Sequence, residues 1–378
     1  MATGYYQTPQ APRLYVSYPL FAYATGGLGY TKAESISKEE TLSLIQLDPA
    51  NYVEFNPDGN SEYFDFKCVP LDLNPEEEVD DGNWWNFNYC MILGHNLADL
   101  DAYPEVQAYQ TQLNSNSAVR DASDPDGFPE TISTGQDLVN FEGPYGVPYN
   151  GWSAFSLTDT PTNADVQWLR LRLRSTTTFN NKTLGLGAAL WGKYWDAPQN
   201  VNLNTSLSYS YGIKQKTTKS GKSLTNINWT KPNSWVGGNE PFGLTDKYNV
   251  PTGDSHFRKT GKRTWKMSWD SLEPKYVMNQ NPMLNSLGWE KKDNYQADAN
   301  DESLYNIYNS NDGDSSLGDF YTDVIHKTLG GSLPMVLCLD KNDHSPSNMA
   351  IVKMTKPPTI TQKSPNLYHI TITLEEQI

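Results

Sequence analysis

The hydrophobic pattern is clearest in residues 262–272, where large apolar and polar side chains alternate one by one. The apolar side chains of this segment are Trp265, Met267 and Trp269, and the intervening positions hold lysine, threonine or serine. A period of two is typical of a strand with one buried and one solvent-facing side. Pro274 and a helix-forming run follow at once, and proline suits the first turn of a helix. The pattern therefore predicts a strand that leads into a short helix.

The same reasoning predicts strands along most of the chain. Residues 167–174 alternate leucine with arginine, and the second half of residues 84–93 is an unbroken apolar run, typical of a central strand covered on both faces. A β-rich run at 14–24 contains Pro19, which favours an edge strand or a bulge. Further strands are expected at 152–157, 184–192, 203–211, 333–339, 349–354 and 367–374, and helical spacing is found at 320–329.

A basic hairpin is predicted directly after residues 203–211. Its lysines are Lys214, Lys216, Lys219 and Lys222, grouped around a Ser-Gly pair at 220–221. Serine and glycine favour a tight turn, so we expect a long hairpin with a positively charged tip.

Composition supports a mainly β protein. The 378 residues include 27 glycines, 24 prolines and 23 tyrosines, and 12% of the residues are aromatic. The net charge of −15 argues against nucleic-acid binding, which requires lysine and arginine to neutralise phosphates. The sequence contains no apolar run of the ~20 residues that a membrane-spanning helix needs, and its first residues lack the pattern of a signal peptide. We therefore expect neither a membrane span nor secretion.

Few residues point to chemistry. His95 lies in a Gly-His-Asn-Leu sequence at 94–97 without a nucleophile motif or paired carboxylates, so we expect it to bond backbone groups where the chain leaves a strand. The three cysteines, Cys68, Cys90 and Cys338, are widely spaced and are expected to be buried thiols. An acidic run at 76–81 is expected to be a solvated loop, with a divalent-cation site as the alternative. No cofactor, resident metal or enzymatic activity is predicted.

A domain boundary is predicted at the Ala-Pro-Gln-Asn sequence of residues 197–200. Residues 1–196, with an N-terminal arm at 1–12, form the first expected domain, and residues 197–378 form the second.

Two stretches resemble known families. The Ile-Leu-Gly-His-Asn-Leu sequence at 92–97, with the strands that follow it, resembles galactose-binding-like jelly-roll modules of phage tail proteins. The second stretch combines Arg-Thr-Trp-Lys-Met-Ser-Trp-Asp-Ser-Leu at 263–272 with a helix, Gly-Gly-Ser-Leu-Pro-Met-Val-Leu at 330–337, and a final strand ending in Leu-Glu-Glu at 374–376. This order is similar to the tail-tube-like β fold of minor tail and distal-tail proteins.

The resemblance implies a virion structural protein in the tip of a phage tail, an adaptor between tail tube and fibres or baseplate that is assembled in the host cytoplasm. The implied partners are copies of itself in a ring and other tail proteins. Lysines on an otherwise acidic chain favour charge pairing between neighbouring subunits. The predicted oligomer interface consists of Lys214, Lys216, Lys219, Lys222, Arg263, Trp265 and Trp269.

The alternative is a carbohydrate- or receptor-binding module on the virion surface, in which aromatic side chains of the jelly roll stack on host glycans. Its candidate residues are Trp84, Trp85, Tyr145, Tyr149 and Trp152. A glycan hydrolase, by contrast, needs two carboxylates about 5–10 Å apart, and the sequence does not place such a pair.

Overall fold

The computed structural model describes residues 10–26, 28–33, 36–48, 52–57, 59, 61–68, 89–109, 130–133, 138–139, 152–156, 168–175, 179, 182–227, 262–277, 320–342, 349–365 and 367–377. Strands dominate these residues, and their pairings are antiparallel. Within the same ranges, no helix has the length and apolar character needed to cross a membrane. The predicted mainly β fold class is confirmed.

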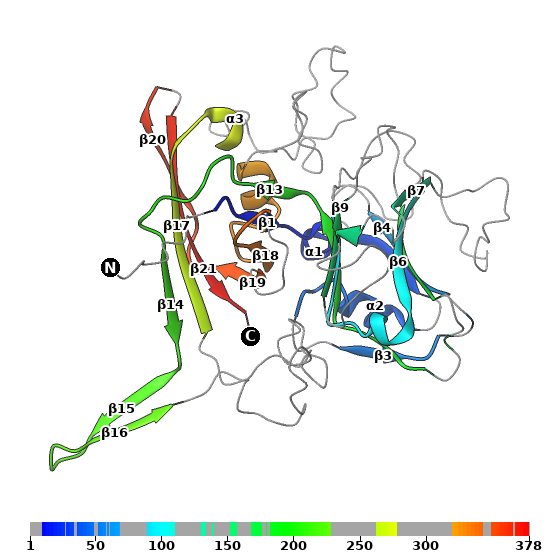
Figure 1. Ribbon diagram of the computed structural model, residues 1–378, viewed down its shortest axis with the longest axis horizontal. Helices are drawn as coiled ribbons and strands as arrows, with labels where there is room; N and C mark the ends of the chain where they lie inside the picture. The colour runs from blue at the N-terminus through cyan, green and yellow to red at the C-terminus, as the bar shows by residue number, and fades with distance from the viewer. Residues whose placement is uncertain are drawn as a thin grey trace, which may run out of the picture.

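The N-terminal half forms a β-sandwich of the predicted jelly-roll type (Figure 1). One sheet has the strand order β2-β4-β10-β6-β7, and the facing sheet has the order β12-β5-β9-β8. The strands of the first sheet are β2 (Leu28–Ala33), β4 (Ser61–Cys68), β10 (Trp168–Ser175), β6 (Ala102–Tyr109) and β7 (Glu130–Ser133). Those of the second are β12 (Ala188–Gly192), β5 (Tyr89–Leu93), β9 (Trp152–Ser156) and β8 (Leu138–Val139). Smaller elements complete this half: α2 (Lys38–Ser43), the short pair β3 (Val53–Phe55) and β11 (Leu184–Leu186), and the 3-10 turn η1 (Leu97–Leu100).

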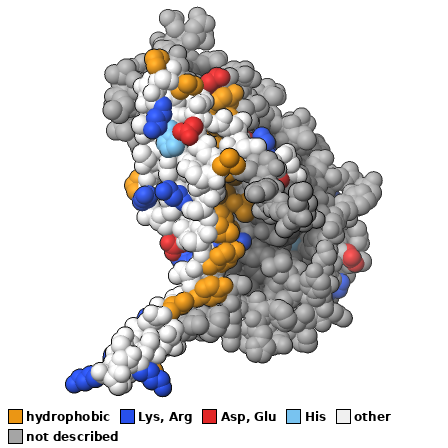
Figure 2. Space-filling view, turned by 60° about the vertical axis from the view of Figure 1, so that its left-hand side comes forward, with side chains coloured by type: hydrophobic (Ala, Val, Ile, Leu, Met, Phe, Trp, Pro, Cys, Tyr) orange, Lys and Arg blue, Asp and Glu red, His pale blue; other side chains and the backbone are white. Residues whose placement is uncertain are grey.

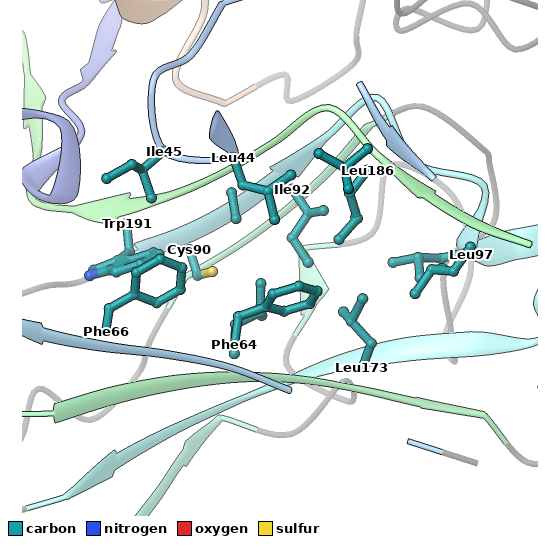
Figure 3. Packing of buried hydrophobic residues seen from close by; sticks show 14 of the residues in the cluster. Leu44, Ile45, Phe64, Phe66, Cys90, Ile92, Leu97, Leu173, Leu186 and Trp191 are labelled. Atoms are coloured by element: carbon teal, nitrogen blue, oxygen red, sulfur yellow. The ribbon is translucent and has the colours of Figure 1, made fainter. Parts of the chain in front are cut away.

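The core of the sandwich lies between these two sheets, where Figure 3 shows side chains from both pointing toward one another. Phe66 of β4 packs on Trp191 of β12 with ring centroids 4.6 Å apart. Every side chain of β5 is buried, as predicted for a central strand. In β10 the leucines Leu171 and Leu173 are fully buried while the arginines between and after them are partly exposed. The alternation read from the sequence is thus confirmed.

A third large sheet, which we call the main sheet, contains most of the C-terminal half, in the order β13-β1-β18-β19-β21-β17-β14, with β20 also pairing with β21. Its strands are β13 (Tyr194–Asp196), β1 (Arg13–Tyr15), β18 (Met335–Cys338), β19 (Met349–Met354), β21 (Leu367–Glu376), β17 (Lys262–Leu272), β14 (Ser206–Ser210) and β20 (Thr359–Ser364). The predicted strand β17 is confirmed, because Trp265, Met267 and Trp269 are buried against the core. The predicted helix is confirmed as α3 (Pro274–Val277).

The N-terminal segment at 14–24 differs from its prediction. Only β1 is a strand, and α1 (Tyr18–Thr25) is a helix instead of an edge strand. The Ser17 hydroxyl accepts a hydrogen bond from the Leu20 N–H, Pro19 lies in the first turn, and Gly26 ends the helix with a φ of 81°. Cap, proline and glycine are local helix-boundary signals, and they outweigh the β-rich composition of the segment.

Three other segments refine the predictions. Residues 184–192 form two strands, β11 and β12, which belong to different sheets. The helical spacing at 320–329 corresponds to a π-helix, η6 (Tyr321–His326). Strand β20, directly after Pro357-Pro358, is a strand that the hydrophobic pattern did not predict.

The two halves share structure at their junction. β1 and β13, from the N-terminal half, pair with each other, and β1 also pairs with β18. A third hydrophobic cluster joins β5 of the sandwich to β18 and β19, and the Tyr89 hydroxyl donates to the Val16 carbonyl at 2.7 Å. The boundary at residue 196 remains a prediction.

A fragment of residues 1–196 is expected to fold on its own, because the whole sandwich core cluster comes from residues 18–191. Its weak point is β1, which loses its partner β18 and exposes an edge. We expect a cooperative thermal transition by circular dichroism, and better solubility for a matched fragment of residues 16–193 that lacks β1 and β13. If both fragments are molten or insoluble, the predicted boundary is wrong.

Candidate functional site

Residues 203–227, a segment that we call the projection, contribute to none of the three hydrophobic core clusters. It contains β14, β15 (Ile213–Thr217) and β16 (Ser223–Ile227). β14 pairs with β17 of the main sheet, whereas β15 and β16 pair only with each other within the described residues. Figure 1 shows this hairpin extending away from the rest of the molecule.

Local chemistry explains the shape of the projection. Gly212, with a φ of 59°, separates β14 from β15, and such a conformation is easy only for glycine. At the tip, the Thr218 N–H donates to the Lys222 carbonyl at 2.8 Å, and the Gly221 N–H donates to the Thr218 carbonyl at 2.9 Å. The predicted hairpin with a lysine-bearing tip is confirmed.

The root of the projection is held firmly to β17. The Asn202 side-chain amide donates to Asp270 Oδ2 at 2.6 Å, and its backbone N–H donates to the Ser268 carbonyl at 2.9 Å. The Ser268 hydroxyl bonds Asn204 Oδ1 at 3.0 Å. Asp270 itself lies in a β-bulge, next to Ser271 with a φ of 61°, and also contacts His369. A fixed root gives the projection a defined direction.

Large apolar side chains follow the projection on its surface. We call this set the apolar stripe: Leu203, Leu207, Tyr209, Tyr211 and Ile213. Their exposed fractions run from 36% for Tyr211 to 89% for Leu203. Figure 2 shows apolar side chains continuing down the molecule onto the projection. Monomeric proteins seldom expose a contiguous patch of this kind without a binding role.

The apolar stripe continues the buried side of the main sheet. Leu207 lies opposite Trp265 in the β14–β17 register, and directly opposed residues project from the same face. Trp265 is only 2% exposed, whereas Leu207 is 46% exposed. The core-facing side of the sheet therefore extends past the core onto a strand that nothing covers within the described residues.

Charge is distributed unevenly between the projection and the rest of the chain. Residues 199–227 contain four lysines and no aspartate or glutamate, so the remaining residues carry a net charge of −19 within a total of −15. All four lysines are exposed. Lys214 and Lys216 share one face of the hairpin with Leu224, and Lys219 and Lys222 lie in the turn. This arrangement suits contact with an acidic surface.

The other three residues of the predicted interface contact other parts of this chain. Trp265 and Trp269 are buried in the hydrophobic core that packs on the main sheet. This burial corrects the interpretation that they face a partner. Arg263 lies over Trp265 at 5.0 Å and forms a two-point ion pair with Glu376, with distances of 2.6 and 2.9 Å. The apolar stripe, by contrast, is exposed, although an alternating pattern alone would assign its residues to a buried face.

Of the candidate glycan-stacking residues, only the backbone of Trp152 is described; Trp84, Trp85, Tyr145 and Tyr149 lie outside the described residues. Trp152 pairs with Leu93, at the end of β5. Trp84 and Trp85 precede the opposite end of β5 in the sequence. A single stacking platform built from all of them remains a prediction, and so does a cation site at 76–81, which is also outside the described part.

His95 has the structural role expected of it. Its side chain is buried, and Nδ1 accepts a hydrogen bond from the Leu97 N–H at 3.3 Å. The neighbouring Asn96 bonds the Thr183 carbonyl at 2.8 Å and the Gly185 N–H at 2.9 Å. The Gly-His-Asn turn thus ties the end of β5 to β11.

Replacing His95 with alanine is expected to cost about 1–3 kcal/mol of unfolding free energy, because the Leu97 N–H loses its hydrogen-bond acceptor in a buried site. Chemical denaturation measures the effect, and His369→Ala, at a partly exposed histidine, serves as the comparison. An unchanged denaturation midpoint for His95→Ala contradicts the structural role.

Thiol and metal chemistry find little support in the described residues. Cys90 and Cys338 are buried, as predicted. Burial raises the pKa of the Cys90 thiol, which keeps it protonated and unreactive. The parts of the chain with defined positions contain no cluster of three or more histidine, cysteine, aspartate or glutamate side chains arranged to bind a metal ion.

Comparison with known proteins gives weak similarities. No protein-family model matches the sequence, and no curated protein does. Among solved structures, one similar chain is a CBM32 module from a family 31 glycoside hydrolase of Clostridium perfringens, with a TM-score of 0.26 and 8% identity over 45% of this chain and 99% of that one. Another is truncated AlyQ with CBM32 and alginate lyase domains, with a TM-score of 0.26 and 7% identity over 70% of this chain and 49% of that one. This chain thus spans about half the length of the second structure. Neither of these structures is described as a phage protein, and at such TM-scores neither likeness supports an argument about function.

Replacing Lys214, Lys216, Lys219 and Lys222 together with glutamate is expected to leave the fold intact, because all four side chains are exposed. Each exposed ion pair contributes only ~0–1 kcal/mol, but an oligomer repeats the contact in every subunit. We therefore expect the variant to lose oligomers in sedimentation while its thermal unfolding matches the parent. The corresponding four-arginine variant is the control. Oligomers that survive in the glutamate variant, or a parent that never assembles alone or with tail partners, contradict the prediction.

Proposed function

We propose that this chain is a structural component of a larger assembly, specifically a distal-tail or hub adaptor in the tip of a phage tail. The observation that carries the proposal is the projection, which exposes the five large apolar side chains of the stripe on a rigidly rooted extension. Such a surface costs solubility in a monomer and becomes favourable only when a partner covers it.

Charge and topology support the same function. The basic projection and the acidic remainder of the chain favour contacts between subunits over nucleic-acid binding. The tail setting itself rests on the sequence resemblance. The motifs at 263–272 and 374–376, on which this resemblance mainly depends, lie in β17 and β21, and these strands pair along most of their lengths.

The direct test is location in the particle. Antibody raised against this chain is expected to label the end of the tail on purified virions, and the chain is expected to co-purify with tail proteins at a fixed stoichiometry. Label absent from intact and disrupted virions overturns the tail assignment.

A second candidate function is glycan binding by the N-terminal sandwich, on the virion surface or elsewhere. It is supported by the jelly-roll-type framework and by the aromatic residues in sequence next to β5 and β9.

Glycan arrays separate the two candidates. Binding that is lost in Trp152→Ala and kept in Tyr209→Ala, on the projection, supports the sandwich as a glycan-binding module. Absence of binding to any host glycan, together with tail labelling, leaves the assembly function alone. No enzymatic activity is proposed.

A further inference from the structure

Strand β14 has an edge that lacks the usual protection. It lies at the end of the strand order in the main sheet and pairs only with β17 among the residues that the structure describes. Proteins usually shield such edges with charged residues, proline or a covering element. From Leu203 to Ile213 the sequence contains no charged residue and no proline. Within the described ranges this edge is open, and it is chemically suited to accept another strand.

The apolar stripe runs beside this open edge. Leu207 and Tyr209 alternate with serines along β14, so one face of the strand is apolar and the other carries small hydroxyls. An added strand pairs its backbone with β14 and at the same time packs its side chains on Leu207 and Tyr209. Backbone hydrogen bonds and apolar burial therefore act together at one place.

We infer that β14 is completed by a strand from a second copy of this chain, which covers the apolar stripe. This inference deepens the proposed assembly function by naming the partner and the contact.

Two observations select this occupant. Unpaired N–H and C=O groups on a strand edge need hydrogen-bond partners, which another strand supplies and the hydrocarbon of a lipid surface does not. The lysines at 214–222 continue beyond β14 and are complementary to an acidic surface, and the chain outside residues 199–227 carries a net charge of −19. A second copy offers both a strand-rich body and the complementary charge.

The two parts of the projection contribute differently to this contact. The stripe and the strand edge set how long the complex lasts, and the lysines accelerate encounter through long-range attraction that salt screens. Added salt is therefore expected to slow association more than it accelerates dissociation.

Sedimentation velocity of the full chain across a concentration series tests the inference with variants at adjacent positions. In Leu207→Lys/Tyr209→Lys, charge is placed on the apolar face of β14 at two half-exposed residues. In Ser206→Lys/Ser208→Lys, the same charge is placed on the same strand but on the opposite, polar face. We expect the first variant to raise the dissociation constant for self-association at least about tenfold, the second to change it little, and both to keep the parent's thermal midpoint.

A parent that remains monomeric at every concentration overturns the inference, as does a Leu207→Lys/Tyr209→Lys variant that associates like the parent. Monomeric protein that floats with phosphatidylserine vesicles only when Leu207 and Tyr209 are intact also overturns it, in favour of a membrane. The outcomes remain distinct from those of the proposed function. Self-association through β14 without tail labelling refutes the tail adaptor alone, and tail labelling by a chain that does not self-associate refutes this inference alone.

Discussion

Arg13→Ala is expected to lower the free energy of unfolding by about 3–5 kcal/mol, the cost of leaving one partner of a buried ion pair alone. Arg13 in β1 and Asp196 in β13 are both less than a tenth exposed. Two parallel hydrogen bonds join them, Nε to Oδ1 at 2.5 Å and Nη2 to Oδ2 at 2.9 Å. The guanidinium also lies 3.6 Å from the ring centroid of Tyr194. Its removal leaves the Asp196 carboxylate in an apolar site where water is scarce.

The Arg13 guanidinium stays charged at neutral and mildly alkaline pH. Burial acts to lower the pKa of Arg13, but the hydrogen bonds to Asp196 and the neighbouring phenols more than offset it and raise the pKa. The loss in Arg13→Ala is therefore expected to be the same at neutral and mildly alkaline pH.

Denaturant unfolding of Arg13→Ala, Asp196→Ala and the double variant measures the pair. The double variant is expected to be less destabilised than the sum of the single variants, because neither charge is then left alone. Lys262→Ala is the matched control, since its ion pair with Glu375 is partly exposed and should contribute ~0–1 kcal/mol. If Arg13→Ala costs no more than Lys262→Ala, the buried pair does not hold β1 in the sheet.

Strand positions could be predicted where the burial of each face is reflected in the strand's own residues. In β17 and β10 the alternation of apolar and polar residues directly records one buried and one wetter face. In β5 the continuous apolar run records burial on both faces. These patterns are local, so the sequence reveals them without knowledge of the partners.

The helix α1 could not be recognised from periodicity. Its first five residues, from Tyr18 to Ala22, are all buried, so no polar face marks a period of 3.6. Its boundaries carried the information instead, in Ser17, Pro19 and Gly26. Composition alone favours a strand here, and the capping interactions decide otherwise.

Pairings between distant segments left no local trace. Arg13 meets Asp196 across 183 residues, and β1 then meets β18 from the other half of the chain. Each strand reads as an ordinary short apolar run, and the choice of partner depends on the packing of the whole sheet. For this reason the sequence predicts a boundary near residue 196 but not the strands shared across it.

At the candidate interface, an alternating pattern occurs both in a buried strand and in an exposed one. Leu207 and Trp265 both alternate with polar residues and lie opposite each other, yet only Trp265 is covered. A pattern identifies which residues share a face, whereas burial depends on what is packed against that face. The sequence therefore placed the lysines correctly on an exposed hairpin but assigned Trp265 and Trp269 to a partner instead of to the core.

Trp269→Ala is expected to destabilise the protein by about 3–5 kcal/mol, the usual loss for a fully buried tryptophan. Its side chain is 0% exposed and meets Trp195 of β13 edge-on, with ring centroids 5.7 Å apart. Trp195 in turn packs on Phe320 at 5.0 Å, so the cavity opens where β17, β13 and the segment before η6 meet. We expect the loss of folding energy to be accompanied by faster proteolysis near residue 197.

Trp269→Phe separates packing from hydrogen bonding at the same position. The indole N–H of Trp269 is buried and has no hydrogen-bond partner within the described residues, so phenylalanine removes a polar group that contributes no bond while it keeps most of the ring. We expect less than half of the destabilisation seen in Trp269→Ala, measured by denaturant unfolding monitored by circular dichroism. Equal losses in the two variants would mean that the N–H has a partner that stabilises the fold, and a negligible loss in Trp269→Ala would mean that β17 does not pack its tryptophans in this core.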